Sequence, residues 1–269
     1  MAVGEGRVVP ADHGLQWARD GVELVSAAPV VWLGMALLFV LLGVALSIVP
    51  GVSLLWNVAV PILLGGVMLG CEAMRQGRPL EVRHLFAGFE APRMQQLALV
   101  GALYLAASIL LIVLGVGIAL GGSLLSAAML GSGAFEQSPA LVVGLVATGI
   151  IVFGALAILL SMTIWFAPAL VALDGVAALE AMRISLYASL RNTLPLLVYG
   201  LVLIGVGLLV MAPFIAALIL LPLYQPTGTA PLMIAVAVGR AVFLVICAVA
   251  IAPTIWGAMY ASYRDVFCG

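Results

Sequence analysis

The chain alternates between long apolar runs and short polar breaks. The apolar runs cover about 30–49, 53–74, 96–122, 140–172, 194–222 and 232–262. A helix of about 20 mostly apolar residues crosses the hydrocarbon core of a bilayer, so each run is long enough for one crossing. Turn residues such as Pro50 and Gly51 separate neighbouring runs. The pattern predicts an all-α, polytopic membrane protein with six transmembrane helices.

A second pattern precedes each pair of spans. Segments at about 11–28, 80–90 and 176–191 place apolar residues at helical spacing, with charged residues between them. Helices of this kind lie in the membrane–water interface with the apolar face toward the acyl chains. We therefore expect three interfacial amphipathic helices on one side of the membrane. Their apolar stripes are Leu15, Ala18, Val22 and Val25, then Val82, Leu85, Phe86 and Phe89, then Leu179, Met182, Leu186 and Leu190.

The second span of each pair contains a proline, at Pro61, Pro168 and Pro253. A proline inside a helix lacks an N–H group and frees the carbonyl four residues earlier, so the helix kinks. The order of interfacial helix, span and kinked span predicts a pseudo-threefold repeat. Chance is the alternative, because proline is frequent in membrane helices. In a true repeat the kinked helices face one another, and small residues such as Gly65 and Gly257 let their backbones approach.

Composition supports a membrane location for the whole chain. Of the 269 residues, 65% are hydrophobic and 8% are charged, and the mean hydropathy is +1.32. Soluble domains carry roughly a quarter charged residues. We expect one integral membrane domain over 1–269: an N-terminal segment at 1–29 with the first interfacial helix, a six-helix bundle at 30–262 and a tail at 263–269. The net charge of −1 gives no basis for nucleic-acid binding.

The basic residues predict the orientation. All ten are arginine, and nine lie before span one, between spans two and three, between spans four and five, or after span six. Cytoplasmic loops carry the excess of basic residues, so both termini are predicted to be cytoplasmic. The nine are Arg7, Arg19, Arg75, Arg78, Arg83, Arg93, Arg183, Arg191 and Arg264.

Arg240 is the exception, because it lies inside the apolar run at 235–243. A charge at the centre of a membrane helix costs about 2.5 to 3.5 kcal/mol on insertion scales, and such residues are commonly functional. Two interpretations stay open: Arg240 extends to the outer headgroups as an anchor, which we favour, or it lines a cavity. Together with Pro61, Pro168 and Pro253 it is a candidate functional residue.

Two further features favour structural roles. Asp174 closes an apolar run and precedes Gly175, as a helix stop does, although a carboxylate there could also serve transport. Met68, Cys71 and Met74 recur every three residues, and soft ligands at that spacing can hold Cu(I). Methionine and cysteine are also ordinary packing residues, which we favour here.

Enzyme motifs are missing from the sequence. There is no GxSxG, HExxH or Walker A pattern and no pair of intramembrane carboxylates. The two histidines, His13 and His84, are isolated and are expected to be solvated. We therefore expect no enzymatic activity, and we identify no catalytic residue, cofactor site or metal site.

Three stretches carry a resemblance to a known group of proteins. They are 29–34 after the first amphipathic segment, 77–79 leading to 85–89, and 166–171 leading through 181–185 to 191–192. Their order resembles an uncharacterised family of proteobacterial polytopic inner-membrane proteins. The third stretch is also similar to the membrane domain attached to some glycerophosphodiester phosphodiesterases. The resemblance implies six spans and a bacterial inner-membrane location, and it brings no substrate.

Two functions fit these features. The first is a non-enzymatic inner-membrane scaffold or accessory subunit that organises lipid or a partner protein at the cytoplasmic leaflet. The alternative is a small transporter, channel or lipid-handling protein with a site near the kinked helices and Arg240. The expected partners are membrane lipid or other membrane proteins, and not nucleic acid. The candidate contacts for lipid or a partner are Trp17, Arg83, Phe86, Phe89, Arg183 and Arg191.

The orientation can be tested with topology reporters. A reporter fused after Gly269 is expected to behave as cytoplasmic, and one inserted at Gly228 as external, because nine of the ten arginines lie on the side of the termini. Alkaline phosphatase and fluorescent-protein activities give opposite signals at the two positions. The reverse pattern would contradict the six-span topology and its orientation.

Overall fold

The structure is a computed structural model that describes residues 4, 6–48, 51–90, 93–130, 139–223 and 230–269, and these residues form helices and connecting segments. The prediction of six helices long and apolar enough to span a membrane is confirmed. Pro50 and Gly228 lie outside the described residues. The long helices are α2 (Pro29–Ser47), α3 (Ser53–Arg75), α4 (Arg93–Leu130), α6 (Pro139–Trp165), α9 (Thr193–Leu223) and α10 (Ala230–Cys268).

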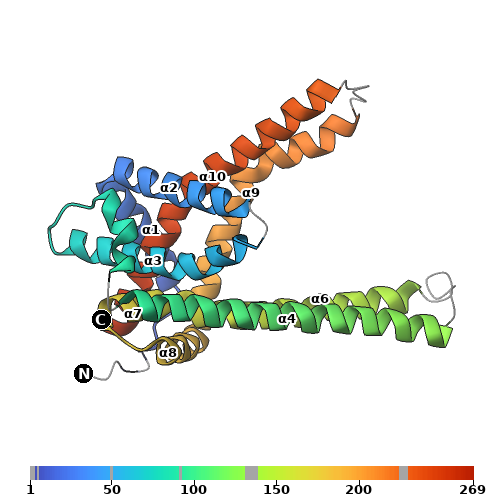
Figure 1. Ribbon diagram of the computed structural model, residues 1–269, viewed down its shortest axis with the longest axis horizontal. Coiled ribbons are helices and arrows are strands. Elements are labelled where there is room, and N and C mark those ends of the chain that lie inside the picture. Colours follow the sequence, from blue (N-terminus) through green and yellow to red (C-terminus); the bar gives the residue numbers. More distant parts are fainter. Residues whose placement is uncertain (1–3, 5, 49–50, 91–92, 131–138, 224–229) are drawn as a thin grey trace.

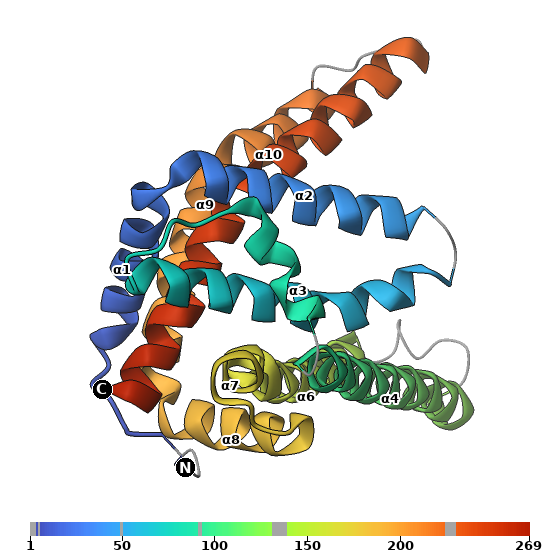
Figure 2. The same ribbon diagram turned by 60° about the vertical axis from the view of Figure 1, so that its left-hand side comes forward.

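The long helices form three hairpins, α2–α3, α4–α6 and α9–α10, which diverge from a common base (Figure 1 and Figure 2). Four shorter elements lie in this base, together with the C-terminal end of the chain. We use "base" for the shorter elements together with the adjoining ends of the hairpins. The shorter elements are α1 (His13–Ala27), the 3-10 helix η1 (Val82–Phe89), α7 (Ala167–Asp174) and α8 (Ala178–Arg191).

Helix α3 is the inner span of the molecule. Of its most apolar stretch 56% is buried, against 11–17% for α2, α4, the α6–α7 span and α9. The apolar surface that the other spans leave exposed is the surface that a bilayer would cover. One face of α3 packs on η1, where Gly66 and Gly88 lie opposite each other. A Cβ atom at Gly88 would collide with the Ile62 carbonyl, so glycine is required for this backbone contact.

Helix α1 packs between α9 and α10 through a face of small residues. Its buried residues are Gly14, Trp17 and Gly21, spaced like one face of a helix. A Cβ atom at Gly14 would collide with the backbone of α9, and one at Gly21 with the backbone of α10. The predicted apolar stripe is therefore only partly the face that packs on the protein: Ala18 and Val25 pack against the core, whereas Leu15 and Val22 stay exposed. Glycine carries no hydrophobic signal, so periodicity did not reveal the packed face.

The other two short elements also differ in detail from the predicted stripes. Because η1 is a 3-10 helix, its period is three residues, so Leu85 and Gly88 are buried while Phe86 and Phe89 are exposed. In α8 the buried face consists mainly of small residues, and Leu179 is exposed. The segment predicted as a tail, 263–269, continues α10 to Cys268.

The three prolines occupy two kinds of position. Pro61 and Pro253 lie inside α3 and α10, as predicted. Pro168 does not, because the span breaks at Phe166 and Pro168 is the second residue of α7, in the first helical turn, where a proline needs no N–H partner. Ser185 Oγ accepts a hydrogen bond from the Phe166 N–H (2.9 Å) and donates one to the Met162 carbonyl (2.7 Å). This hydroxyl satisfies the groups that the break exposes.

The small residues near the prolines do allow close approach, but mostly to other partners than predicted. A side chain at Gly65 would meet Leu97 of α4 and Ala172 of α7, and α7 contains Pro168. Gly257 instead lies against Gly21 of α1. The helix that contacts α10 most closely is therefore the short helix α1 and not a second kinked span.

The contact between α1 and α10 predicts a specific effect of added volume. Replacing Gly257 with Ala is expected to lower the free energy of unfolding by about 1 to 3 kcal/mol, as overpacking does. The new Cβ atom would lie 2.8 Å from the Gly21 Cα. Gly239→Ala is the matched control, because it lies on the same helix and its Cβ would meet nothing within 4 Å. Unfolding in one detergent measures both, and equal stability of the two variants would contradict the contact.

Candidate functional site

The last turns of α10 carry polar side chains that bind other elements of the base. The Tyr260 hydroxyl donates to Glu72 Oε2 on α3, with 2.6 Å between the oxygens. The Tyr263 hydroxyl donates to Asp174 Oδ2 at the end of α7, also at 2.6 Å. Both carboxylates are thereby satisfied where the spans meet. Hydrogen bonds to charged groups are among the stronger ones in proteins, so α10 is linked to α3 and α7 at the base.

Asp265 is the third polar anchor on α10. Its Oδ2 atom faces His13 Nδ1 at 2.6 Å and accepts a hydrogen bond from Trp17 Nε1 at 2.9 Å. Arg7 forms an ion pair with the other carboxylate oxygen. The carboxylate therefore binds α1 and the segment before it to the end of α10. His13 is partly buried in this contact, so its expected solvation was wrong.

Asn192 holds the N-terminal segment from the opposite side. It is fully buried between α8 and α9. Its side-chain oxygen accepts from the Val9 N–H at 2.9 Å, and its amide nitrogen donates to the Arg7 carbonyl at 3.0 Å. The segment before α1 is thus fixed between α8 and α10, although it has no regular secondary structure. The backbone groups of this segment are not paired within a helix, so they need partners such as the Asn192 side chain.

A polar cavity of about 400 Å³ opens between α1 and the end of α10. Charges of both signs line it. Arg7 and Asp265 bind each other, whereas Arg264 and Asp20 form no ion pair or side-chain hydrogen bond with the residues that the structure describes. The remaining lining includes Gln16, Trp17, Leu24, Tyr260 and Cys268.

The electrostatic setting of Asp20 is unusual. Partial burial raises the pKa of the Asp20 carboxyl, and repulsion by Glu23 and Asp265 raises it further. A raised pKa means that the surroundings disfavour the negative charge. Asp20 is therefore a carboxylate in a disfavouring environment, with no ion-pair partner among the described residues.

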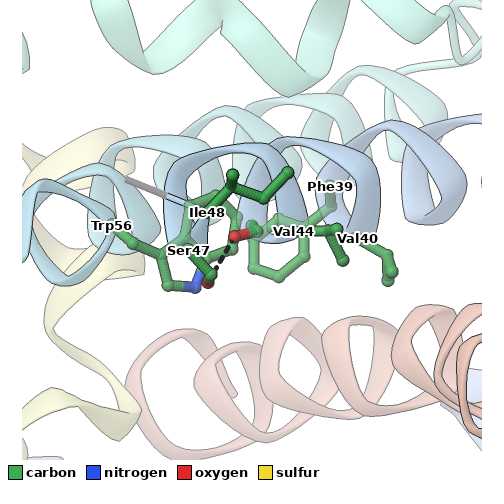
Figure 3. Close-up of a pocket in the computed structure, with 7 residues that line it drawn as sticks. Phe39, Val40, Val44, Ser47, Ile48 and Trp56 are labelled. Atoms are coloured by element: carbon green, nitrogen blue, oxygen red, sulfur yellow. Dashed lines mark hydrogen bonds between the residues drawn. The ribbon is translucent and has the colours of Figure 1, made fainter. Parts of the chain in front are cut away.

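A second, apolar groove of about 470 Å³ lies between α2 and α3, away from the base (Figure 3). Its only side-chain hydrogen bond among the described residues joins the Ser47 hydroxyl to the Gly43 carbonyl within α2, at 2.7 Å. Trp56 closes the groove against Gly43. The groove is lined by no titratable side chain, so its lining offers no acid, base or charged group for catalysis or ion binding. Its other lining residues are Phe39, Val40, Val44 and Ile48.

The structure separates the predicted contact residues into two groups. Arg83, Phe86 and Phe89 lie together on η1, and Arg183 lies with Arg191 on α8, all of them with exposed side chains. Arg83 forms an ion pair with Glu81, and Arg183 forms one with Glu180 and lies over the Tyr187 ring. These five remain on the surface of the base.

The other predicted site residues lie elsewhere. Trp17 is 1% exposed and bound to Asp265, so it is unavailable to lipid or a partner. Arg240 lies in α10, half-buried, before the stretch that joins the base. Pro61, Pro168 and Pro253 are buried. The structure does not bring Arg240 and the prolines together with the polar cavity.

Two structural interpretations from the sequence are confirmed. Helix α7 ends at Asp174, and Gly175 has a φ of 69°, the left-handed conformation of a helix stop. Met68 and Cys71 are fully buried in the hydrophobic core, as packing residues are. Asp174 also has a partner that the sequence did not reveal, the Tyr263 hydroxyl.

The residues that organise the base do not stand out in the sequence. Tyr260, Tyr263 and Asp265 lie at the end of a span, where tyrosine and charged residues are ordinary. Glu72 lies one turn before the end of another span, among the arginines of its loop. The dense polar series at 260–265 after an apolar run is the one local signal that could have selected them.

Two Tyr→Phe substitutions test the importance of these bonds. Tyr260→Phe is expected to lower the free energy of unfolding by about 2 kcal/mol, because Glu72 loses a donor. Tyr199→Phe is the control, because the buried Tyr199 hydroxyl has no hydrogen-bond partner among the described residues. Its removal is expected to be neutral or stabilising. Denaturant unfolding in detergent measures both, and equal losses would contradict the role of the Tyr260–Glu72 bond.

Comparison with known proteins does not extend this description. No family model, curated protein or solved structure matches the chain.

Proposed function

We propose that this protein is a non-enzymatic scaffold or accessory subunit of the bacterial inner membrane, whose base organises lipid at the cytoplasmic leaflet. Both termini are cytoplasmic in this proposal, and the six spans hold the base in place. The observation that carries it is the surface of the base, where exposed apolar and charged side chains alternate.

The surface of η1 provides the clearest part of this interface. Phe86 and Phe89 are each 42% exposed, and their ring centroids lie 6.4 Å apart. Arg83 extends beside them into solvent with Glu81 as its partner. Aromatic rings next to an exposed guanidinium match the boundary between acyl chains and headgroups. These residues therefore fit an interfacial anchor.

Helices α1 and α8 add two further surfaces of the same kind. Leu15 and Val22 are exposed on α1, and Leu179 and Leu190 are exposed on α8 near Arg183. All three surfaces lie in the base (Figure 2). Three amphipathic elements at one end of the molecule support a role at one leaflet, as the repeat pattern in the sequence predicts.

The polar groups inside the spans argue against a transport pathway. Near the base, Glu72 and Asp174 bind tyrosines of α10. Among the described residues, the Tyr199 hydroxyl is the one buried side-chain polar atom without a partner. Transport sites use broken helices whose polar groups face a substrate near the midplane. Here the break at Phe166 is satisfied internally by Ser185, so a scaffold is favoured.

The arginines support the orientation. Nine of the ten belong to the N-terminal segment, to the short elements of the base, to the connection before η1 or to the adjoining ends of the spans. The positive-inside rule then assigns the base to the cytoplasmic leaflet, whose anionic lipids attract such a surface. The resemblance to proteobacterial inner-membrane proteins supports the same location.

A lipid-handling protein or small transporter is the second candidate. The apolar groove between α2 and α3 favours it, because a cleft of this size can hold part of an acyl chain. The half-buried Arg240 in α10 adds a polar group within a span. If Arg240→Gln abolishes lipid or solute movement in proteoliposomes, this candidate replaces the scaffold.

The anchor on η1 gives a direct test of the scaffold. Purification in mild detergent followed by mass spectrometry is expected to find phospholipid retained by the wild-type protein. Replacing Phe86 and Phe89 with Ser should release most of it, because the aromatic anchor is lost. The matched control replaces both with Leu, which keeps the apolar surface and should keep the lipid. Equal retention by both pairs, or no lipid on the wild type, would refute the proposal.

A further inference from the structure

The polar cavity between α1 and α10 has a charge pattern that its own residues do not complete. Arg7 and Asp265 neutralise each other in its wall. Arg264 on α10 and Asp20 on α1 also line the cavity, but they lie too far apart to form an ion pair. Neither has an ion-pair partner among the described residues. The cavity therefore presents a guanidinium from α10 and a carboxylate from α1 that are not paired with each other.

This pattern selects a class of ligand. A guanidinium donates parallel hydrogen bonds to phosphate oxygens, and a carboxylate accepts hydrogen bonds from an ammonium group. A purely anionic ligand would face repulsion from Asp20 and the nearby Glu23. A zwitterion that carries a phosphate and a primary ammonium group satisfies both walls at once. At about 400 Å³ the cavity has room for such a small polar group.

We propose that this cavity binds a phosphoethanolamine group, with its phosphate on Arg264 and its ammonium on Asp20. The inference deepens the proposed function, because it names the lipid headgroup that the base would hold. Trp17 and Leu24 form an apolar part of the wall beside the charged groups. The same chemistry occurs in a phosphatidylethanolamine headgroup and in free phosphoethanolamine, so the experiment includes both.

The raised pKa of Asp20 agrees with this assignment. Its charge is disfavoured by burial and by Glu23 and Asp265, and an ammonium group would relieve that cost. The raised pKa of the Asp20 carboxyl also predicts that the Asp20→Asn variant folds. An acid with a raised folded-state pKa destabilises the fold as the pH rises through that value, so the neutral amide is expected to be at least as stable at neutral pH.

The test titrates the full-length protein in detergent with short-chain phosphatidylethanolamine, phosphatidylcholine, phosphatidylglycerol and free phosphoethanolamine, followed by native mass spectrometry. The wild type is expected to bind phosphatidylethanolamine at least tenfold more tightly than phosphatidylcholine, whose quaternary ammonium has no N–H donor. Arg264→Gln should weaken both phosphatidylethanolamine and phosphatidylglycerol. Asp20→Asn should weaken phosphatidylethanolamine alone and leave phosphatidylglycerol unchanged or tighter, because it removes a repulsion.

Neighbouring exposed charges provide matched controls. Arg19→Gln on α1 and Asp12→Asn just before α1 remove charges of the same two signs without altering the lining of the cavity. Both should retain the wild-type preference for phosphatidylethanolamine. Melting temperatures of all variants exclude unfolding as the cause of lost binding. If Arg264→Gln does not fold, Arg264→Lys replaces it and is expected to bind with intermediate affinity.

The outcomes separate this site from the scaffold proposal. If the wild type holds lipid through η1 but shows no preference among the headgroups, or if Arg264 and Asp20 variants bind like their controls, the cavity assignment is wrong and the scaffold stands. If the wild type binds no lipid at all, both fail. Binding of free phosphoethanolamine as tight as that of the lipid would support the site with a soluble ligand.

Discussion

Hydrogen bonding at the end of α10 is the interaction on which the base depends. In lipid, apolar side chains gain little by leaving the acyl chains, so helices associate through close packing and interhelical hydrogen bonds. Tyr260 and Tyr263 bind carboxylates on α3 and α7, and Asp265 binds α1 and the N-terminal segment. Three hairpins that diverge elsewhere are thereby fastened together at one end (Figure 1).

Close packing of backbones is the second interaction that holds the base together. Glycines at the contacts of η1 with α3 and of α1 with α10 bring backbones together where a single methyl group would collide. The short elements are therefore fixed by their small faces, and their large apolar side chains remain outside. An element can therefore be part of the folded base and still expose Phe86 or Leu15 on the surface.

The distribution of polar groups also separates the spans from the base. Carboxylates near the span ends are satisfied internally, while the cavity beside α1 holds a cation and a carboxylate with no ion-pair partner among the described residues. A site with charges of both signs on two different helices would discriminate between headgroups by charge pattern, and affinity for anions alone would not do so. The proposed scaffold and its proposed ligand site are thus adjacent but depend on different residues.

The six spans, the helix stop at Asp174 and the short elements at 11–28, 80–90 and 176–191 were predictable, because length, hydropathy and periodicity are local properties. The break at Phe166 was not predictable, because the groups that it exposes are satisfied by Ser185, which lies in a different helix, α8. Trp17 illustrates the same limit: its position predicted an interfacial ring, and only the approach of Asp265 decided its burial. The cavity depends on Asp20 and Arg264, which are 244 positions apart and ordinary in the sequence. Local pattern determined what each segment is, and tertiary contacts decided which faces meet.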